Sequence, residues 1–284
     1  MLELTRTVRF CPDPQRRDTP PRANTFAAWP AMRGLGRYYE LQVRCAGEAD
    51  PVTGYFMNIT HIDAAVREHA LPAIEQALAV GAGCDVPLGS LMRRLCTLLD
   101  QPLHQSVVEL RLVLTPYYSI QATVEQGRDI TTMSHVTIRE QFEFSAAHRL
   151  HVPGYSDPKN REIFGNCNNP TGHGHNYRLE VAVRAPIDDA GHVAPVEQLD
   201  ALVDREVIQK LDHKHLNCDV PQFENLNPSV EHIAKVICDM LAAPAAAAEL
   251  MLEEVRVWET GKTVCTYRGP GARAEGLTSQ AAGR

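Results

Sequence analysis

The feature that most constrains the fold of this chain is an internal repeat. Residues 34–43, GLGRYYELQV, align with residues 172–181, GHGHNYRLEV, at a constant offset of 138. Residues 109–112, ELRL, also align with residues 254–257, EVRV. Chance alignment of two amphipathic domains is the alternative, but a repeat of this kind, with a shared order of elements, favours duplication of one structural unit.

The second half predicts the order strand, strand, helix, helix, strand, strand. Alternating apolar residues indicate strands, and apolar stripes with a period of 3.6 residues indicate helices. The expected elements are strands at 137–144 and 176–184, helices at 196–211 and from Asn227-Pro228 onward, and strands around 255–257 and 264–267. The first half predicts the same order, with helical stripes that begin at Ile62 and Leu88. We therefore expect an α+β fold with a first domain at residues 1–128, a second at residues 135–268 and a disordered tail at residues 269–284.

Composition excludes some partners. The net charge of −7 argues against nucleic acid or an anionic membrane surface as the main partner. No apolar run reaches the roughly 18 residues of a membrane span, and the first residues lack the apolar core of a secretory signal. The eight cysteines are scattered without a CxxC pair, which is typical of reduced thiols and predicts a cytoplasmic protein.

Three histidines form a candidate metal site. His173 and His175 are two residues apart at the edge of an alternating strand, so both side chains project from one face. His148, at the end of the preceding strand, completes a set of three imidazoles, which suits a catalytic zinc ion with an open fourth position. The alternative is a pair of surface histidines in a glycine-rich turn.

Four further residues are candidates for chemistry. Cys167 lies six residues before His173 and is either a fourth zinc ligand or a free thiol that acts as an acid or base. Asp212 and His213 end a helix and can supply a companion acid, although histidines are also common at helix C-termini for electrostatic reasons. Glu259, at a strand end, can grip a guanidine-like ring edge through paired hydrogen bonds, or it is simply solvated.

Five motifs together resemble those of the family of 6-pyruvoyltetrahydropterin synthases and 6-carboxytetrahydropterin synthases. They match in order and spacing over about residues 137–268 and read FSAAHRL from Phe144, CNNPTGHGHNY from Cys167, LDHK from Leu211, NPSVE from Asn227 and VWET from Val257. The resemblance implies the T-fold, an antiparallel four-stranded sheet with two helices between its middle strands. Together with the repeat it predicts two tandem T-fold domains, in a homo-oligomer whose sheets close a barrel.

The same resemblance implies roles for individual residues. It implies that zinc is held by three histidines, which are His148, His173 and His175. Cys167 corresponds to the catalytic thiol, Asp212 and His213 match its acid–base partners, and Glu259 matches the carboxylate that anchors the pterin ring.

The implied reaction is that of a zinc-dependent lyase. Its substrate is 7,8-dihydroneopterin triphosphate, and the loss of triphosphate gives 6-pyruvoyl-tetrahydropterin for tetrahydrobiopterin synthesis. The cysteine-to-histidine spacing of six resembles the pyruvoyl-forming branch. The alternatives are a 6-carboxy-5,6,7,8-tetrahydropterin synthase of queuosine biosynthesis, a dihydroneopterin aldolase-like enzyme, and a non-catalytic, zinc-stabilised assembly module.

The first half retains the frame of the motif without its ligands. Leu35 and Arg37 stand at the positions of His173 and His175, and Leu114 falls opposite Glu259. No Asp-His pair follows its first helix. We expect residues 1–128 to be a degenerate copy that binds no zinc and helps to complete the barrel.

Overall fold

The computed structural model describes residues 1–13, 24, 26–32, 34–80, 86–125, 127, 129–269 and 272. The chain forms two compact units, the first made of Met1–Arg139 with Ala185–Ala194, and the second of Glu140–Arg184 with Pro195–Arg284. The predicted tail at 269–284 lies outside the described residues, except for Gly269 and Ala272. The domain bounds 1–128 and 135–268 stay a prediction.

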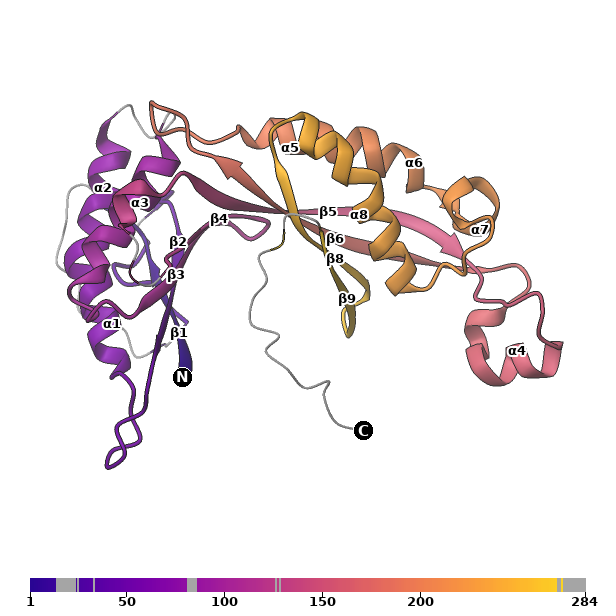
Figure 1. Cartoon of the computed structure of the whole chain (residues 1–284), viewed down its shortest axis with the longest axis horizontal. Coiled ribbons are helices and arrows are strands. Elements are labelled where there is room, and N and C mark those ends of the chain that lie inside the picture. The colour runs from indigo at the N-terminus through magenta and orange to yellow at the C-terminus, as the bar shows by residue number, and fades with distance from the viewer. Residues whose placement is uncertain are drawn as a thin grey trace. The chain divides into compact units, whose positions relative to one another are not determined.

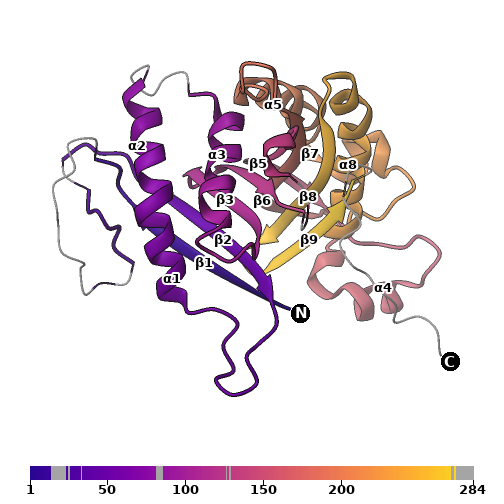
Figure 2. The same cartoon turned by 60° about the vertical axis from the view of Figure 1, so that its left-hand side comes forward.

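The first unit is a four-stranded antiparallel sheet with helices on one face (Figure 2). Its strands, in the order in which they pair, are β1 (Leu2–Phe10), β2 (Tyr39–Gly47), β3 (Val107–Thr115) and β4 (Tyr118–Thr123). Its helices are α1 (Ile59–Ala65), the π-helical turn η1 (Val66–Ala70), α2 (Leu71–Ala79), α3 (Leu88–Asp100) and the 3-10 turn η3 (Ile130–Thr132). Helix α1, η1 and α2 follow one another without a break, so the layer consists of two long helical segments.

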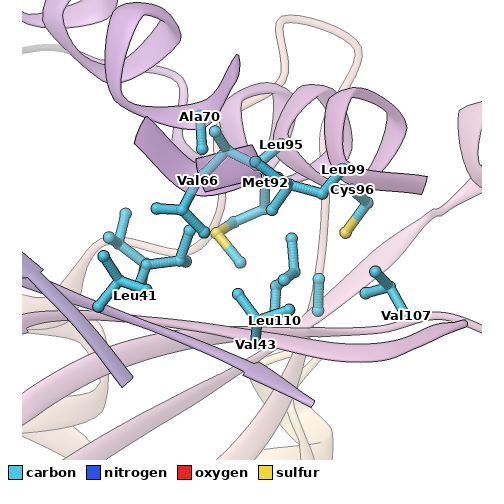
Figure 3. Packing of buried hydrophobic residues seen from close by; sticks show 14 of the residues in the cluster. Leu41, Val43, Val66, Ala70, Met92, Leu95, Cys96, Leu99, Val107 and Leu110 are labelled. Atoms are coloured by element: carbon cyan, nitrogen blue, oxygen red, sulfur yellow. The ribbon is translucent and has the colours of Figure 1, made fainter. Parts of the chain in front are cut away.

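The core of the first unit lies between this sheet and its helices (Figure 3). Alternate residues of the strands, such as Leu41, Val43 and Leu110, are fully buried on the helix-facing side. Met92 and Leu95 of α3 face them and are also fully buried. The period-two pattern of the strands and the apolar stripe of the helix therefore meet in one layer of side chains.

The second unit repeats the order of elements and adds short segments (Figure 1). Its strands are most of β5 (His135–His148) and most of β6 (His173–Pro186), with β7 (Lys214–His215), β8 (Met251–Thr260) and β9 (Thr263–Arg268). Its helical segments are α4 (Asp157–Phe164), η4 (Gly165–Asn168), α5 (Val196–Val203), η5 (Asp204–Ile208), α6 (Gln209–Leu211), α7 (Leu216–Asp219), η6 (Pro221–Phe223) and α8 (Val230–Ala247). The main strands neighbour one another in the order β5-β6-β8-β9, while β7 pairs with β5 in parallel. The pairs β6/β8 and β8/β9 are antiparallel. Helices α5, α6 and α8 lie on one face of this sheet.

The second long helix begins later than the sequence predicts. Asn227 and Pro228 were expected to cap and open it, but α8 starts at Val230, with Ser229 as the N-cap residue whose side chain accepts from the amide of His232. The side-chain oxygen of Asn227 instead accepts a hydrogen bond from the amide of His151, and the carbonyl of Pro228 accepts one from His148. The two residues therefore belong to the candidate site and not to the helix.

These observations confirm the predicted α+β class with antiparallel sheets. The seven cysteines among the described residues are free. In the described part of the chain, no helix is both long and apolar enough to cross a bilayer.

Candidate active site

Three histidine side chains meet at one end of the sheet of the second unit. His148 is the last residue of β5, and His173 and His175 begin β6. One ligand atom from each lies within 4.8 Å of the others, and their ring centroids are 4.5 to 5.2 Å apart. The spacing of two along β6 places both of its histidines on the face that carries the buried Tyr177. The structure thus brings together all three predicted ligands.

The orientation of His148 is fixed by a backbone carbonyl. Its side chain is fully buried, and its Nδ1 donates to the Pro228 carbonyl oxygen over 2.7 Å. A proton held on Nδ1 leaves the lone pair on Nε2, which lies 3.1 Å from Nε2 of His173. A hydrogen bond from the second ring nitrogen to a carbonyl is the usual support for a metal-bound histidine.

The donor set fits a divalent metal ion. Burial lowers the pKa of His148 and of His173, which favours the neutral form that binds metal. Nε2 of His175 is buried and has no hydrogen-bond partner among the described residues. A shared cation would satisfy the Nε2 atoms of His148 and His173, which otherwise face each other, and Nε2 of His175, which makes no hydrogen bond to a described residue. The described residues therefore contain a three-histidine group that can hold a metal ion.

Glu259 lies beside the histidines. Strand β8 pairs Trp258 with Arg178 of β6, so the next residue along β8, Glu259, comes opposite Tyr177. Its Oε1 is 3.5 Å from Nε2 of His148 and 3.8 Å from Nε2 of His175. The sequence placed this carboxylate at a strand end but did not predict its contact with the metal ligands, because that contact depends on the register of two strands about 80 residues apart.

Cys167 lies in the turn that leads to the histidine pair. It is part of η4, and its carbonyl accepts from the amide of Leu150, which ties the turn to the segment after His148. Its thiol is partly buried and does not belong to the group of metal-ligand atoms found among the described residues. Burial, followed by the charge of Glu259, raises the pKa of the thiol. Both influences favour the thiol over the thiolate, and a thiol can donate a proton.

Asp212 and His213 form a pair on the edge of β5. Asp212 accepts the amide of Ser145 at Oδ1 and the Nδ1 proton of His213 at Oδ2, both over 2.7 Å. These two contacts, led by the Ser145 amide, lower the pKa of Asp212. The imidazole of His213 is 83% exposed, and its backbone adopts a positive φ of 56°. No hydrogen bond or ion pair between described residues joins this pair to Cys167 or to the three histidines.

Tyr177 is a part of the site that the sequence analysis did not single out. Its ring is fully buried and lies edge-on to His148 and His175, with centroids 6.1 and 5.5 Å away. Burial raises the pKa of its hydroxyl, so the phenol is neutral. The signal was its spacing of two from His175, which puts it on the same face of β6.

At the matching end of the sheet in the first unit, the described residues do not include the three histidines. Phe10 is the last residue of β1, as His148 is of β5. Phe10 lies edge-on to Tyr39 at 6.4 Å and 70°, which parallels His148 against Tyr177 at 6.1 Å and 87°. Phe10 therefore stands where the second unit has His148, in addition to Leu35 and Arg37 at the positions of the other two histidines. Sequence comparison had not identified this third replacement.

Comparison with known proteins finds relatives that match the second half of the chain. A family model described as 6-pyruvoyl tetrahydropterin synthase matches residues 137–270. A 6-pyruvoyl tetrahydrobiopterin synthase of Drosophila melanogaster is 43% identical over 139 residues, which cover 49% of this chain and 81% of that protein. The human protein of the same name is 38% identical over 133 residues, which cover 46% of this chain and 90% of its own length. Among solved structures, the 6-pyruvoyl tetrahydropterin synthase of Caenorhabditis elegans is 36% identical, with a TM-score of 0.45, and the match covers 48% of this chain and 96% of that one.

Proposed function

The chain belongs to the 6-pyruvoyl tetrahydropterin synthase family, a family of lyases, and on this basis we propose that it converts 7,8-dihydroneopterin triphosphate to 6-pyruvoyl-tetrahydropterin with loss of triphosphate. The predicted family and the predicted enzyme class are thereby confirmed. The observation that carries the specific reaction is the cluster of three histidines with a carboxylate and a thiol beside it, inside the segment that matches the family. The relatives are named 6-pyruvoyl tetrahydrobiopterin synthases, and this supports the pyruvoyl product and a role in tetrahydrobiopterin synthesis.

The proposed cofactor is zinc, held by His148, His173 and His175. When bound, zinc polarises the side-chain oxygens of the pterin and makes the neighbouring C–H protons easier to remove. The protein's own part is to present three imidazole side chains at one point. The Pro228 carbonyl contributes by keeping the Nδ1 proton of His148 in place.

The proposed proton carriers are Cys167 and the Asp212–His213 pair. A protonated thiol can deliver a proton to a carbon that has gained negative charge, and a thiolate can remove one. Asp212 accepts the Nδ1 proton of His213 and so leaves the outer nitrogen of an exposed imidazole free to exchange protons. We assign Glu259 to the pterin ring, whose edge offers paired donors to a carboxylate.

We further propose that both units are T-folds, in tandem, and that the first is a degenerate copy without zinc. Its role is to complete a barrel in a homo-oligomer formed through the sheets. Residues 1–128 and 135–268 remain the proposed domain bounds, and the cytoplasm the proposed compartment.

Triphosphate release from dihydroneopterin triphosphate tests the lyase directly. Purified zinc-loaded protein is expected to release it and to yield a product with the mass of 6-pyruvoyl-tetrahydropterin. A carboxy product would assign the chain to the queuosine branch, and cleavage of the side chain without triphosphate release would indicate an aldolase-like enzyme. If the protein binds zinc but converts no substrate, the result would favour the non-catalytic assembly module.

A further inference from the structure

The first unit contains a cavity of about 340 Å³ between its helices and the end of its sheet. The wall comes from α2 and α3 on one side and from β2 and β3 on the other. It consists mainly of aliphatic side chains, among them Ala77, Leu78, Leu88, Leu91, Leu112 and Leu114. The cavity opens to solvent on one side, and its volume is that of a small ligand pocket.

The cavity lies at the end of the sheet that carries the metal ligands in the second unit. Tyr39, at its wall, is the residue that aligns with Tyr177, and Leu114 is the residue that aligns with Glu259. Leu88 and Leu91 come from the first turns of α3, whose counterpart α8 begins just after Pro228. The first unit therefore has an apolar hollow at the position where the second unit has its polar site.

The chemistry of the wall restricts what can enter. Among the described residues that line the cavity, none is charged, and the polar side chains are Tyr39 and Thr115. Thr115 is exposed and marks the polar, outer end. A pterin ring has donors and acceptors along its edges, and burying them here without partners would be unfavourable. A ring that carries only one polar group loses far fewer hydrogen bonds in such a place.

We propose that this cavity is a binding site for a small, uncharged aromatic molecule of one or two fused rings that carries a single polar group. Its volume is within the range of ligand pockets, which are mostly apolar with a few polar groups that set orientation. Enclosed apolar cavities lined by aliphatic side chains accept simple aromatic molecules, and the inner wall of this cavity has the same chemistry. The ring packs against the leucines, and its polar group points to the Thr115 end. The site is independent of zinc and of the lyase reaction.

Indole is the probe for the experiment, because it has two fused rings and one N–H group. Calorimetric titration of the full chain with indole is expected to show saturable binding to one site. Ala77→Phe places a ring inside the cavity and is expected to weaken indole binding at least tenfold. Ala79→Phe is the matched control, because Ala79 is exposed on the same helix two residues later, and binding to it should stay within twofold of wild type.

A second measurement covers the case in which Ala77→Phe does not fold. In wild-type protein with labelled leucine methyl groups, indole protons are expected to show nuclear Overhauser effects to Leu88, Leu91 and Leu112. The absence of saturable binding, the absence of these effects, or equal weakening by both alanine variants would overturn the proposal. Loss of binding in His173→Ala would also overturn it, because that result would place indole in the second unit.

Discussion

His148 is held from two sides, by the end of β5 and by the Pro228 carbonyl. The sequence motif identified His148, His173 and His175 as partners because strand alternation and the His-x-His spacing are local signals. The hydrogen bond from His148 to Pro228 joins residues 80 apart, and no local pattern predicts it. The approach of Glu259 to the histidines was missed for the same reason.

The role of Cys167 can be separated from that of a zinc ligand by one substitution. Cys167→Ala is expected to lower kcat by a factor of about 10²–10⁴, the usual contribution of a positioned acid or base, with zinc content unchanged. Cys218→Ala is the control, because Cys218 is an exposed cysteine and its loss should leave turnover intact. Steady-state kinetics and metal analysis provide both readouts. A parallel loss of zinc and activity in Cys167→Ala would make Cys167 a ligand.

The place of Glu259 beside the histidines gives a second prediction at this scale. Glu259→Gln keeps the shape of the side chain but removes the charge that pairs with the ring edge of the pterin. We expect kcat/KM to fall by about 10- to 100-fold, since a hydrogen bond to a charged group contributes about 1.5–3 kcal/mol. The zinc content should stay near that of the wild type. A large loss of zinc would show instead that the carboxylate binds the metal.

At the scale of elements, the turn that leads into β6 depends on a glycine. Gly172 has a φ of 76°, and a Cβ on it would lie 2.6 Å from Nε2 of His215 and 3.1 Å from the carbonyl oxygen of His148. Gly172→Ala is therefore expected to lower the free energy of unfolding by about 1–3 kcal/mol and to reduce zinc affinity. Gly174→Ala serves as the matched control, because the nearest atom to its Cβ, the Ala146 carbonyl oxygen, is 3.6 Å away. Urea denaturation and zinc titration measure the stability and the zinc affinity of both variants. Equal effects of the two substitutions would show that the turn does not depend on Gly172.

The contact between β5 and α5 gives a prediction about pH. Burial, together with the charges of Asp200 and Glu197, raises the pKa of Glu140 to about 8, and its Oε2 has no hydrogen-bond partner among the described residues. Between about pH 4.5 and about pH 8, Glu140 is therefore protonated in the folded state but ionised in the unfolded state. Stability should fall as pH rises from about 4.5 to about 8.

Glu140→Gln removes this dependence. The variant is expected to be more stable than wild type by about 1–2 kcal/mol at pH 8.5, which is less than the full shift implies because the carboxyl is partly exposed. Near pH 4.5 the two proteins should differ little. Glu143→Gln, an exposed position on the same strand, is the control for urea denaturation at both pH values. A gain that is the same at both pH values would show that charge is not its cause.

The order of the elements was predictable because apolar periodicity and the repeat are strong signals, but some boundaries were not. The predicted strand 137–144 extends to His135–His148, and the second long helix begins at Val230 and not at Asn227-Pro228. Both residues have the side-chain chemistry of a helix start. In the folded unit, however, the Pro228 carbonyl accepts a hydrogen bond from His148, and the Asn227 side chain accepts one from the amide of His151. These tertiary hydrogen bonds override the local preference of the two residues for a helix start.

At the scale of the whole molecule, the chain contains the same order of elements twice, and the described residues contain one three-histidine group. The alignment of residues 34–43 with 172–181 predicted two of the three replacements in the first unit, because those positions lie inside the repeat. Phe10 lies outside the aligned stretch, but the same offset of 138 relates it to His148. The matching contacts of Phe10 with Tyr39 and of His148 with Tyr177 support that correspondence.

This asymmetry predicts a zinc stoichiometry of one ion per chain. The side chains of Phe10 and Leu35 offer no ligand atom, and the Arg37 guanidinium is permanently charged, so the first unit is expected to bind no zinc. His173→Ala should reduce the bound zinc from one equivalent to near zero, because two imidazoles hold the ion much more weakly than three. Metal analysis of dialysed full-length protein gives both values. Two equivalents in the wild type, or one remaining in His173→Ala, would show that the first unit has retained a metal site of its own.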